Sequence, residues 1–395
     1  MRALALGLAA AGLAACGGGG GGSSSQGATA AASGAAPAGP PPIVGDVATS
    51  PVRVAYQEIA TGLAFPWGIA FLPNGDALVT ERDGRLRVIR NGRLDPAPVT
   101  GVPPVFAEGQ GGLLDVVLDP DFASNQRIYL SFAHGASGAN GTRIVRARFD
   151  GRALSEVTPI FTANPLKHGA AHFGGRMAIL PDRTLVLTLG EGYAFKDEAQ
   201  KLDNDFGKIV RLTLDGQPAP GNPYIGQSGR RAEVYSYGHR NVQGVAFDPA
   251  TGVLWAHEHG PRGGDELNII RPGVNYGWPE ITYGVDYSGA IISPFTARDG
   301  MEQPQAVWVP SIAPSGMIQY RGSLFPQWRG DLIVSALAGM QARRVDLEGA
   351  RVVGQDKLFA DLNARIRQVA EAPDGSIWLL IDSPEGRVLR VTPRT

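Results

Sequence analysis

One arrangement of hydrophobic and polar positions recurs along most of the chain: an apolar run, a turn that carries Pro or Asp with Gly or Asn, and a second apolar run. Short apolar runs bounded by turn residues are typical of paired β-strands. The arrangement occurs at Trp67–Thr80, Leu113–Phe132, Arg176–Leu189, Val245–Ala256, Met317–Ser335 (with a looser turn) and Ile366–Ile381. Between these units we predict further strands at Leu86–Ile89, Arg143–Phe149, Ile209–Leu214 and Val388–Val391.

Six copies of one strand pair in a continuous run predict an all-β fold, a six-bladed β-propeller over residues 52–395. The short, protected sheet edges of a propeller suit a chain made of many hairpins. A pair of β-sandwiches is the alternative, but it explains neither the single repeated unit nor the lack of a linker. The composition agrees with a folded, soluble chain, because 43% of the residues are hydrophobic and 18% are charged.

The first residues have the features of an export signal. One early positive charge precedes an apolar stretch that is too short to span a membrane, and Leu13-Ala14-Ala15-Cys16 resembles the bacterial lipobox. We therefore predict a lipoprotein signal peptide at 1–15 and lipidation of Cys16, which is the only cysteine in the chain. An ordinary secretory signal with an incidental cysteine is the alternative.

A tract rich in Gly, Ser, Ala and Pro follows, and we predict that residues 16–51 form a tether. The expected location is periplasmic and lipid-anchored. Assignment to the outer membrane rests on Gly17, where an acidic residue would favour the inner membrane. The anchor is the only membrane contact that we expect.

The charge pattern gives no indication of a nucleic-acid partner. The formal net charge is -1, and no cluster of Lys and Arg tracks along the chain in the way that phosphate binding requires. Whether the protein is a monomer or a homodimer is left open by the sequence.

Seven short motifs are more specific than a general propeller pattern. They read GQGGLLDVVLDPDF (109–122), HFGGRM (172–177), LGEG (189–192), YGHRNVQG (237–244), EHGPRGGDE (258–266), NYGWP (275–279) and RIRQV (365–369). With these motifs the chain resembles the soluble quinoprotein sugar dehydrogenases, and most of all the aldose sugar dehydrogenases that use pyrroloquinoline quinone (PQQ) and calcium. The resemblance extends from Val54 to Pro393. It implies oxidation of aldoses to lactones at the anomeric carbon, with an external electron acceptor.

The resemblance places the general base on His172 in HFGG. An imidazole that titrates near neutrality is suited to taking the proton of the anomeric hydroxyl while hydride leaves the carbon. Glu191 matches an acidic position that orients this base by accepting its other N–H. The remaining histidines are expected to have no catalytic role: His134, His168 and His257 as surface or loop residues, and His239 and His259 as parts of loop structure.

PQQ is a flat ortho-quinone with three carboxylates, so its site needs cations and a flat apolar face. The resemblance assigns carboxylate binding to Arg365 and Arg367, which lie two residues apart and so face the same way on a strand. It assigns further contacts with the cofactor or sugar to Arg240, Asn241, Gln110 and Tyr287.

The resemblance also assigns cofactor binding to Ala336, Leu337 and Ala338, and the chain departs from its relatives at Ala338. Relatives often have a lysine at the place of Ala338, which this chain lacks. Ala171, before the base, also replaces a polar or acidic residue of some relatives. These changes put the affinity for PQQ and the sugar preference in doubt more than the chemistry.

Two calcium sites are implied by the resemblance. Calcium prefers oxygen ligands, including main-chain carbonyls, and it polarises a carbonyl that is to receive hydride. The carbonyls of Gly260 and Pro261 match the site beside the quinone. The carboxylate of Glu266 and the main-chain oxygen of Tyr276 match a second, structural site.

Two other functions compete with this hypothesis. A calcium-dependent propeller lactonase or esterase would use the metal to activate water, and it would need a ring of acidic or Asn ligands around the axis. A non-catalytic binding propeller that has lost PQQ is favoured by Ala338.

Overall fold

A computed structural model describes residues 43–394. The predicted signal peptide and Cys16 lie outside the described residues, as does most of the predicted tether. In the described part of the chain, no helix is both long and apolar enough to cross a membrane.

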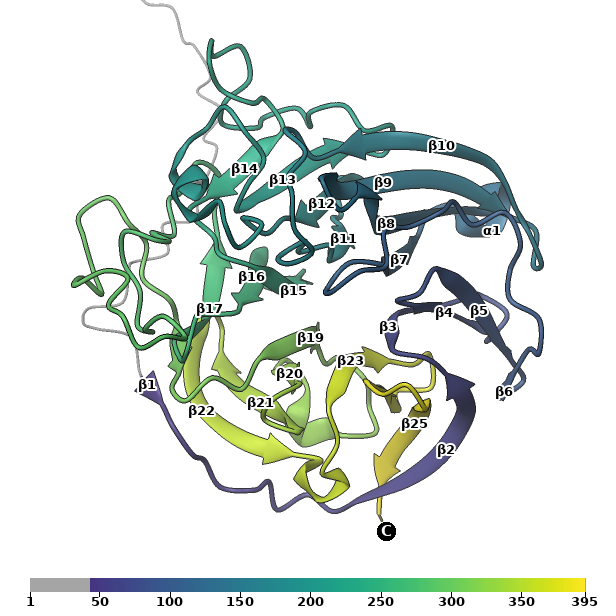
Figure 1. Cartoon of the computed structure of the whole chain (residues 1–395). Coiled ribbons are helices and arrows are strands. Elements are labelled where there is room, and N and C mark those ends of the chain that lie inside the picture. Colours follow the sequence, from purple (N-terminus) through teal and green to yellow (C-terminus); the bar gives the residue numbers. More distant parts are fainter. Residues whose placement is uncertain (1–42, 395) are drawn as a thin grey trace, which may run out of the picture. The chain divides into compact units, whose positions relative to one another are not determined.

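Six sheets lie around a central axis (Figure 1), and the four blade strands of each sheet are antiparallel. Blade 1 consists of β3 (Pro66–Phe71), β4 (Ala77–Glu81), β5 (Arg85–Arg90) and β6 (Arg93–Leu94). Blade 2 consists of β7 (Leu113–Leu118), β8 (Arg127–Ala136), β9 (Ala139–Phe149) and β10 (Leu154–Thr162). Blade 3 consists of β11 (Met177–Ile179), β12 (Thr184–Thr188), β13 (Lys208–Thr213) and β14 (Val234–Tyr237).

Blade 4 consists of β15 (Val242–Asp248), β16 (Val253–Glu258), β17 (Asp265–Ile270) and β18 (Ala306–Trp308). Blade 5 consists of β19 (Pro314–Gln319), β20 (Leu332–Ala336), β21 (Gln341–Glu348) and β22 (Arg351–Leu358). Blade 6 consists of β23 (Ile366–Glu371), β24 (Ile377–Ile381), β25 (Gly386–Pro393) and β2 (Val54–Leu63).

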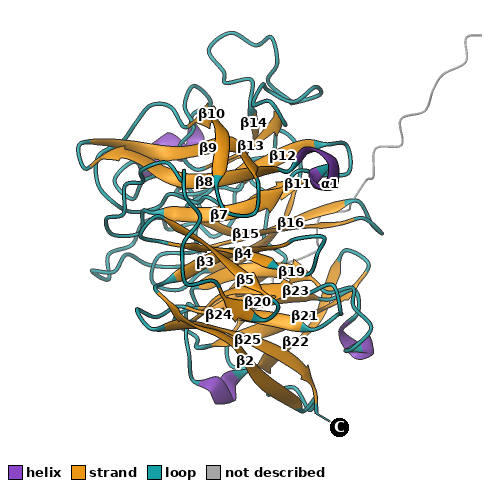
Figure 2. Cartoon of the chain, turned by 90° about the vertical axis from the view of Figure 1, so that its right-hand side faces the viewer, coloured by secondary structure: helices purple, strands orange, loops and turns teal. Residues whose placement is uncertain are grey.

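The helices of the described chain are short, and strands dominate the side view (Figure 2). One α-helical turn, α1 (Phe122–Asn125), lies between β7 and β8. Three 3-10 turns occupy Lys196–Gln200, Pro326–Trp328 and Ala360–Leu362.

The predicted six-bladed β-propeller is confirmed. Each repeated unit of the sequence forms the two innermost strands of one blade, and the four additional predicted strands are the third strands of blades 1, 2, 3 and 6. Several outer strands had no clear signal because few of their side chains are buried, as in β22, where Leu358 alone is buried. A continuous apolar run appears only where a strand packs on both faces.

Blade 6 is closed by both ends of the described chain. The N-terminal strand β2 pairs antiparallel with β25, in a register that runs from Val54 opposite Pro393 to Leu63 opposite Gly386. The two-residue strand β1 (Ile43–Val44), within the stretch predicted as tether, pairs with β18 at the outer edge of blade 4. Because β2 completes blade 6, the ring of blades has no gap between blade 6 and blade 1.

The hydrophobic core is divided into layers that fill the spaces between neighbouring blades. One layer joins blades 4 and 5 through Trp255, Trp308 and Val334, and another joins blades 5 and 6 through Trp328 and Ile366. Each layer therefore depends on two blades, so that no blade can bury its faces alone.

A buried ion pair connects the blades near the axis. The Asp115 carboxylate of β7 accepts hydrogen bonds from Arg176 Nη1 at 3.1 Å and from the Met177 backbone N–H at 2.9 Å. Arg176 Nε also donates to the Gln243 carbonyl of β15 at 3.3 Å, and its guanidinium lies 4.0 Å from the centre of the Trp67 ring. This ion pair therefore joins blades 1 to 4.

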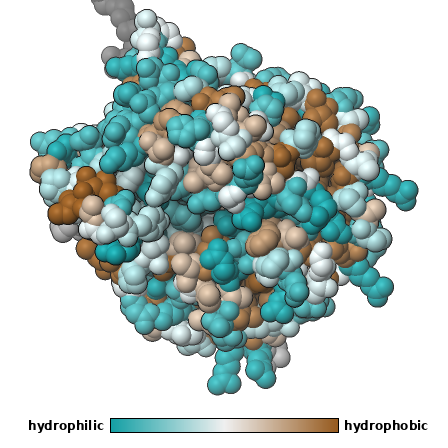
Figure 3. Space-filling view, in the orientation of Figure 1, coloured by the Kyte–Doolittle hydropathy of each residue, from teal (hydrophilic) through white to brown (hydrophobic). Residues whose placement is uncertain are grey.

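The face shown in Figure 3 is mixed in polarity, with a hydrophobic patch at the left edge. The long loop between β17 and β18 reaches this edge in Figure 1 and exposes Tyr287, Ile291 and Phe295.

We expect Asp115→Ala to lower the free energy of unfolding by about 3–5 kcal/mol, because it leaves the Arg176 guanidinium buried and unpaired. Urea unfolding measures the loss. The matched control is Asp121→Ala, which removes an ion pair with Arg183 whose side chains are each 52% exposed, and it should cost less than about 1 kcal/mol. Equal effects of the two variants would contradict the central role of the buried pair.

Candidate functional site

Two cavities open on the axis, at opposite ends of the innermost strands. On β15, Gln243 lines one cavity, while Val245 and Phe247 line the other. On β3, Trp67 lines the first cavity with Gln243, and Ile69 lines the second with Val245 and Phe247. The cavity at the C-terminal ends of these strands is called the funnel below, and the cavity at the N-terminal ends is called the axial pocket.

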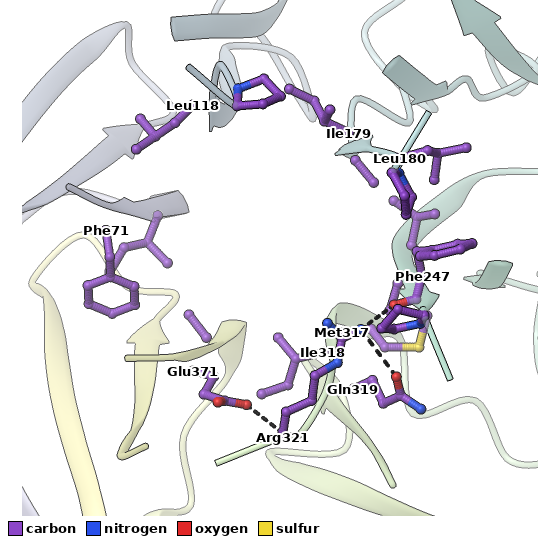
Figure 4. A pocket seen from close by; sticks show the side chains of 18 of the residues that line it. Phe71, Leu118, Ile179, Leu180, Phe247, Met317, Ile318, Gln319, Arg321 and Glu371 are labelled. Carbon is purple, nitrogen blue, oxygen red and sulfur yellow. Dashed lines mark hydrogen bonds between the residues drawn. The ribbon is translucent and has the colours of Figure 1, made fainter. Parts of the chain in front are cut away.

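The funnel has a volume of about 940 Å³ and takes residues from the innermost strand of every blade. Figure 4 shows these side chains around an open centre, with apolar groups such as Phe71, Leu118 and Phe247 on the wall. The Arg321 backbone N–H donates to the Glu371 carboxylate at 2.7 Å. None of the site residues predicted from the sequence lines the funnel.

The axial pocket has a volume of about 250 Å³ and contains many of the predicted residues. Its apolar wall is formed by Trp67, Leu114, Phe173, Ala313 and Leu337. Its polar wall is formed by Arg82, Gln110, Asn241, Gln243, His259, Arg365 and Arg367. Most concave ligand sites combine an apolar wall with a few polar groups in this way.

His172 and Glu191 form a buried pair beside this pocket. His172 Nδ1 lies 3.0 Å from Glu191 Oε1, and both side chains are at most 5% exposed. The backbone holds the histidine in the left-handed region, with φ of 52°, and its N–H donates to Gln110 Oε1 at 2.8 Å. An ionised carboxylate can only accept a hydrogen bond, so Nδ1 carries the hydrogen and the lone pair of Nε2 is left to take a proton.

Burial lowers the pKa of His172 below its ordinary value. The hydrogen bond to Glu191 opposes this shift, while the positive charges of Arg240 and Lys167 add to it. The imidazole is therefore neutral at pH 7, which is the form that a general base requires.

Lys167 is a site residue that sequence reasoning missed. Its side chain is buried, and Nζ donates to Asn140 Oδ1 at 3.0 Å and to the Gly169 carbonyl at 3.2 Å. The ammonium also lies 3.8 Å from the centre of the Phe173 ring. Burial lowers its pKa to about 8, against the attraction of Glu191. A lysine in a Gly-rich loop gives no sequence signal, because its partners come from distant segments.

Arg240 and Asn241 connect the pair to the loop after β16. The Glu191 N–H donates to the Arg240 carbonyl at 3.0 Å, and Asn241 Oδ1 accepts from the Gly174 N–H at 3.2 Å. Arg240 Nη1 donates to the Gly260 carbonyl at 2.7 Å. Tyr287 is 57% exposed, and its ring centre lies 6.0 Å from the Arg240 guanidinium.

Arg365 and Arg367 both line the axial pocket, as the two-residue spacing predicts. Arg365 Nε donates to Asp382 at 2.9 Å, whereas Arg367 Nε lies 3.9 Å from that carboxylate and makes no hydrogen bond within the described residues. Burial lowers the pKa of Arg367 to about 10.

The segment after β20 is only partly in the pocket. Leu337 lines it, Ala336 is fully buried at the end of β20, and Ala338 is exposed and does not line it.

The predicted metal residues surround a second, much smaller cavity. Its volume is about 10 Å³, close to the size of one water molecule, and Gly260, Glu266 and Tyr276 line it together with Glu258. Pro261 is buried next to it in the chain. Burial, together with the charge of Glu258, raises the pKa of Glu266. In residues 43–394, no three His, Cys, Asp or Glu side chains form a metal-binding group, so main-chain oxygens would have to complete any site.

The loop that contains Gly260 is held by Asp265. Its carboxylate accepts from the Gly260 N–H at 3.0 Å, the Ser311 hydroxyl at 2.7 Å and the Ile312 N–H at 2.8 Å. These bonds fix the loop to the start of blade 5.

Among the other histidines, the prediction was wrong for His257. His239 and His259 lie in loops, as predicted. His259 Nε2 donates to the Pro314 carbonyl at 2.7 Å, and His239 Nδ1 lies 2.8 Å from Glu258 Oε1. His257 is not a surface or loop residue, because it is fully buried in β16. The prediction was wrong because an apolar strand pattern can include a histidine.

Comparisons with known proteins agree with this architecture. The family described as Glucose / Sorbosone dehydrogenase matches residues 63–390. The chain is 43% identical to the aldose sugar dehydrogenase YliI of Escherichia coli over 352 residues, which cover 87% of this chain and 94% of that protein.

Two solved structures are also similar. The apo form of the soluble aldose sugar dehydrogenase from Escherichia coli has a TM-score of 0.84 and 41% identity, covering 87% of this chain and 100% of that chain. The PQQ-bound aldose sugar dehydrogenase from Streptomyces coelicolor has a TM-score of 0.72 and 33% identity, covering 87% of this chain and 99% of that chain.

We expect the imidazole of His172 to titrate below the ordinary pKa of 6.5. Lys167→Met should raise this pKa, because it removes a positive charge that disfavours the protonated ring, whereas Lys167→Arg should leave it low. NMR titration of the histidine ring signals, assigned with His172→Ala, measures both effects. A His172 pKa at or above 6.5 in the unmodified protein would contradict the effect of burial. An equal pKa in the two lysine variants would show that the charge of Lys167 does not affect His172.

Proposed function

Because the chain belongs to the glucose/sorbosone dehydrogenase family, we propose that it oxidises aldose sugars to lactones at the anomeric carbon, with PQQ and calcium as cofactors. The observation that supports this most directly is the buried His172–Glu191 pair next to a pocket lined by arginines. An imidazole that is neutral at pH 7 supplies the base, and the pocket supplies a site for an anionic cofactor.

The residues of the axial pocket fit PQQ in shape and charge. Trp67 contributes to the apolar wall, and Arg365 and Arg367 line the same pocket. Arg367 Nε is a buried donor that has no acceptor in the described chain. A carboxylate of the cofactor would satisfy it, and guanidinium–carboxylate pairs are the stronger kind of hydrogen bond.

The residues around the small cavity fit calcium. The chain would supply the carboxylate of Glu266 and the main-chain oxygen of Tyr276 to a structural ion, and the carbonyls of Gly260 and Pro261 to an ion beside the quinone. In residues 43–394 the Glu266 carboxylate makes no ion pair and accepts one side-chain hydrogen bond, from Asn268 Nδ2 at 3.1 Å. The carbonyl of Gly260 accepts a hydrogen bond from Arg240 Nη1.

The chain's own groups would carry out the proton transfer. His172 Nε2 would take the proton of the anomeric hydroxyl as the C1–H bond breaks and the C1=O bond of the lactone forms. Glu191 would hold the Nδ1–H and stabilise the imidazolium. When bound, PQQ polarised by calcium supplies the acceptor of the hydride. The two electrons would finally pass to an external acceptor.

A calcium-dependent lactonase would place its metal differently. It would need acidic or Asn ligands around the axis, but the polar wall of the axial pocket combines arginines with amides and one histidine. This favours an anionic ligand over a metal at the centre of the ring.

We expect the purified protein, loaded with PQQ and calcium, to reduce an artificial electron acceptor when glucose or another aldose is added. His172→Ala should lower kcat/KM by about 10²–10⁴-fold, since that is the usual contribution of a general base. The matched control is His168→Ala, an exposed histidine of the same loop, which should retain the rate. Full activity of His172→Ala, or lactonase activity that persists without PQQ, would reject the proposed function.

We expect calcium to stabilise the unloaded protein by about 2.7 kcal/mol at a hundredfold excess over its dissociation constant. Glu266→Gln should remove most of this gain, because it removes a ligand charge. Without calcium the same variant should be at least as stable as the parent, because it relieves the repulsion between Glu266 and Glu258. Urea unfolding with and without calcium tests both statements, and Glu280→Gln, an exposed acid, is the control.

A further inference from the structure

Arg82 lines the axial pocket, although no motif in the sequence pointed to it. It directly follows β4 and lies among arginines that are paired. Arg85 and Arg87 both bind Glu81, at 2.7 and 3.2 Å, and Arg90 binds Asp95 at 2.6 Å. Arg82 itself has no carboxylate within ion-pair distance in the described part of the chain.

The backbone of Arg82 is held firmly. Its N–H donates to the Phe65 carbonyl at 3.2 Å, and its carbonyl accepts from the Leu113 N–H at 3.0 Å. Gly112 makes this packing possible, because a Cβ there would lie 1.8 Å from the Arg82 carbonyl oxygen and its φ is 137°. The guanidinium rests 4.5 Å from the centre of the Phe65 ring. The side chain is therefore positioned before any ligand arrives, which reduces the entropy lost on binding.

The charges around Arg82 are not balanced. Arg82, Arg365 and Arg367 share the pocket, while Asp382 is the only carboxylate paired with any of them in the described residues. Like charges that gather in a pocket repel one another and are costly unless a ligand of opposite charge binds. Three guanidiniums against one carboxylate match a ligand with more than one negative group.

We propose that Arg82 binds a carboxylate of PQQ, and that blade 1 thereby supplies a cofactor-binding cation to a pocket whose blade 5 segment has none. This inference rests on the proposed function. Ala338, at the place where relatives often have a lysine, is exposed and outside the pocket lining. Arg82 does not occupy the place of that lysine, but it adds the same charge to the same pocket. A guanidinium can also bind a carboxylate through two parallel hydrogen bonds, which an ammonium cannot.

The test is an equilibrium titration of the calcium-loaded protein with PQQ, followed by absorbance, without any sugar. Arg82→Met should raise the Kd by about 10- to 100-fold, the range expected for one hydrogen-bonded charge pair. Arg82→Lys should recover part of the affinity, because it keeps the charge but loses the planar fork. The affinity of Arg82→Met should also fall less steeply with added salt than that of the parent.

The matched control is Arg93→Met, which changes an exposed arginine of β6 in the same blade and should bind PQQ like the parent. A thermal melt of each variant separates lost binding from lost folding, and the Tm of Arg82→Met should stay close to that of the parent. If the parent binds PQQ and Arg82→Met binds it equally well, the inference is wrong while the proposed function stands. If the parent does not bind PQQ, both are overturned.

Discussion

The buried contact between Asp115 and Arg176 is the interaction on which the centre of the propeller depends. Arg176 precedes β11 in blade 3, pairs with Asp115 in blade 2, and donates to a carbonyl in blade 4. Its guanidinium also stacks on Trp67 of blade 1. Four blades therefore meet at one side chain. Because Trp67 also lines the axial pocket, the contact that joins the blades supports the flat wall against which a planar cofactor would lie.

The His172–Glu191 pair is positioned by backbone contacts rather than by the side chains alone. The loop before β11 touches the loop after β12 so closely that a Cβ at Gly190 would lie 2.3 Å from the His172 carbonyl oxygen. Gly190 also bridges to Asn241, and Glu191 bonds to the Arg240 carbonyl. His172, Glu191, Arg240 and Asn241 thus form one connected unit within the described chain. Such preorganisation is what an efficient proton transfer requires.

The sequence predicted features that depend on local patterns and missed those that depend on distant contacts. Paired apolar runs identified the inner strands of all six blades, because these strands are buried on both faces. The motifs located the residues that the structure gathers around the axis, although they are far apart in the chain. Lys167 and Arg82 were missed because each stands in a turn that contains glycine, a pattern typical of solvated residues. The burial of Lys167, and the place of Arg82 in the pocket without an ion pair among the described residues, depend on distant segments of the chain.

The replacement by Ala338 is weak support for a propeller that has lost its cofactor. A purely structural scaffold gains nothing from a buried arginine whose Nε has no acceptor in residues 43–394. Desolvating an unsatisfied charged donor is costly, and apolar residues would fill the space more favourably. Arg367 nevertheless occupies that position, next to Arg82 and Arg365 in one pocket. The neutral histidine and its partner are also intact beside it. Charges that destabilise the empty protein are consistent with the proposed site for an anionic ligand.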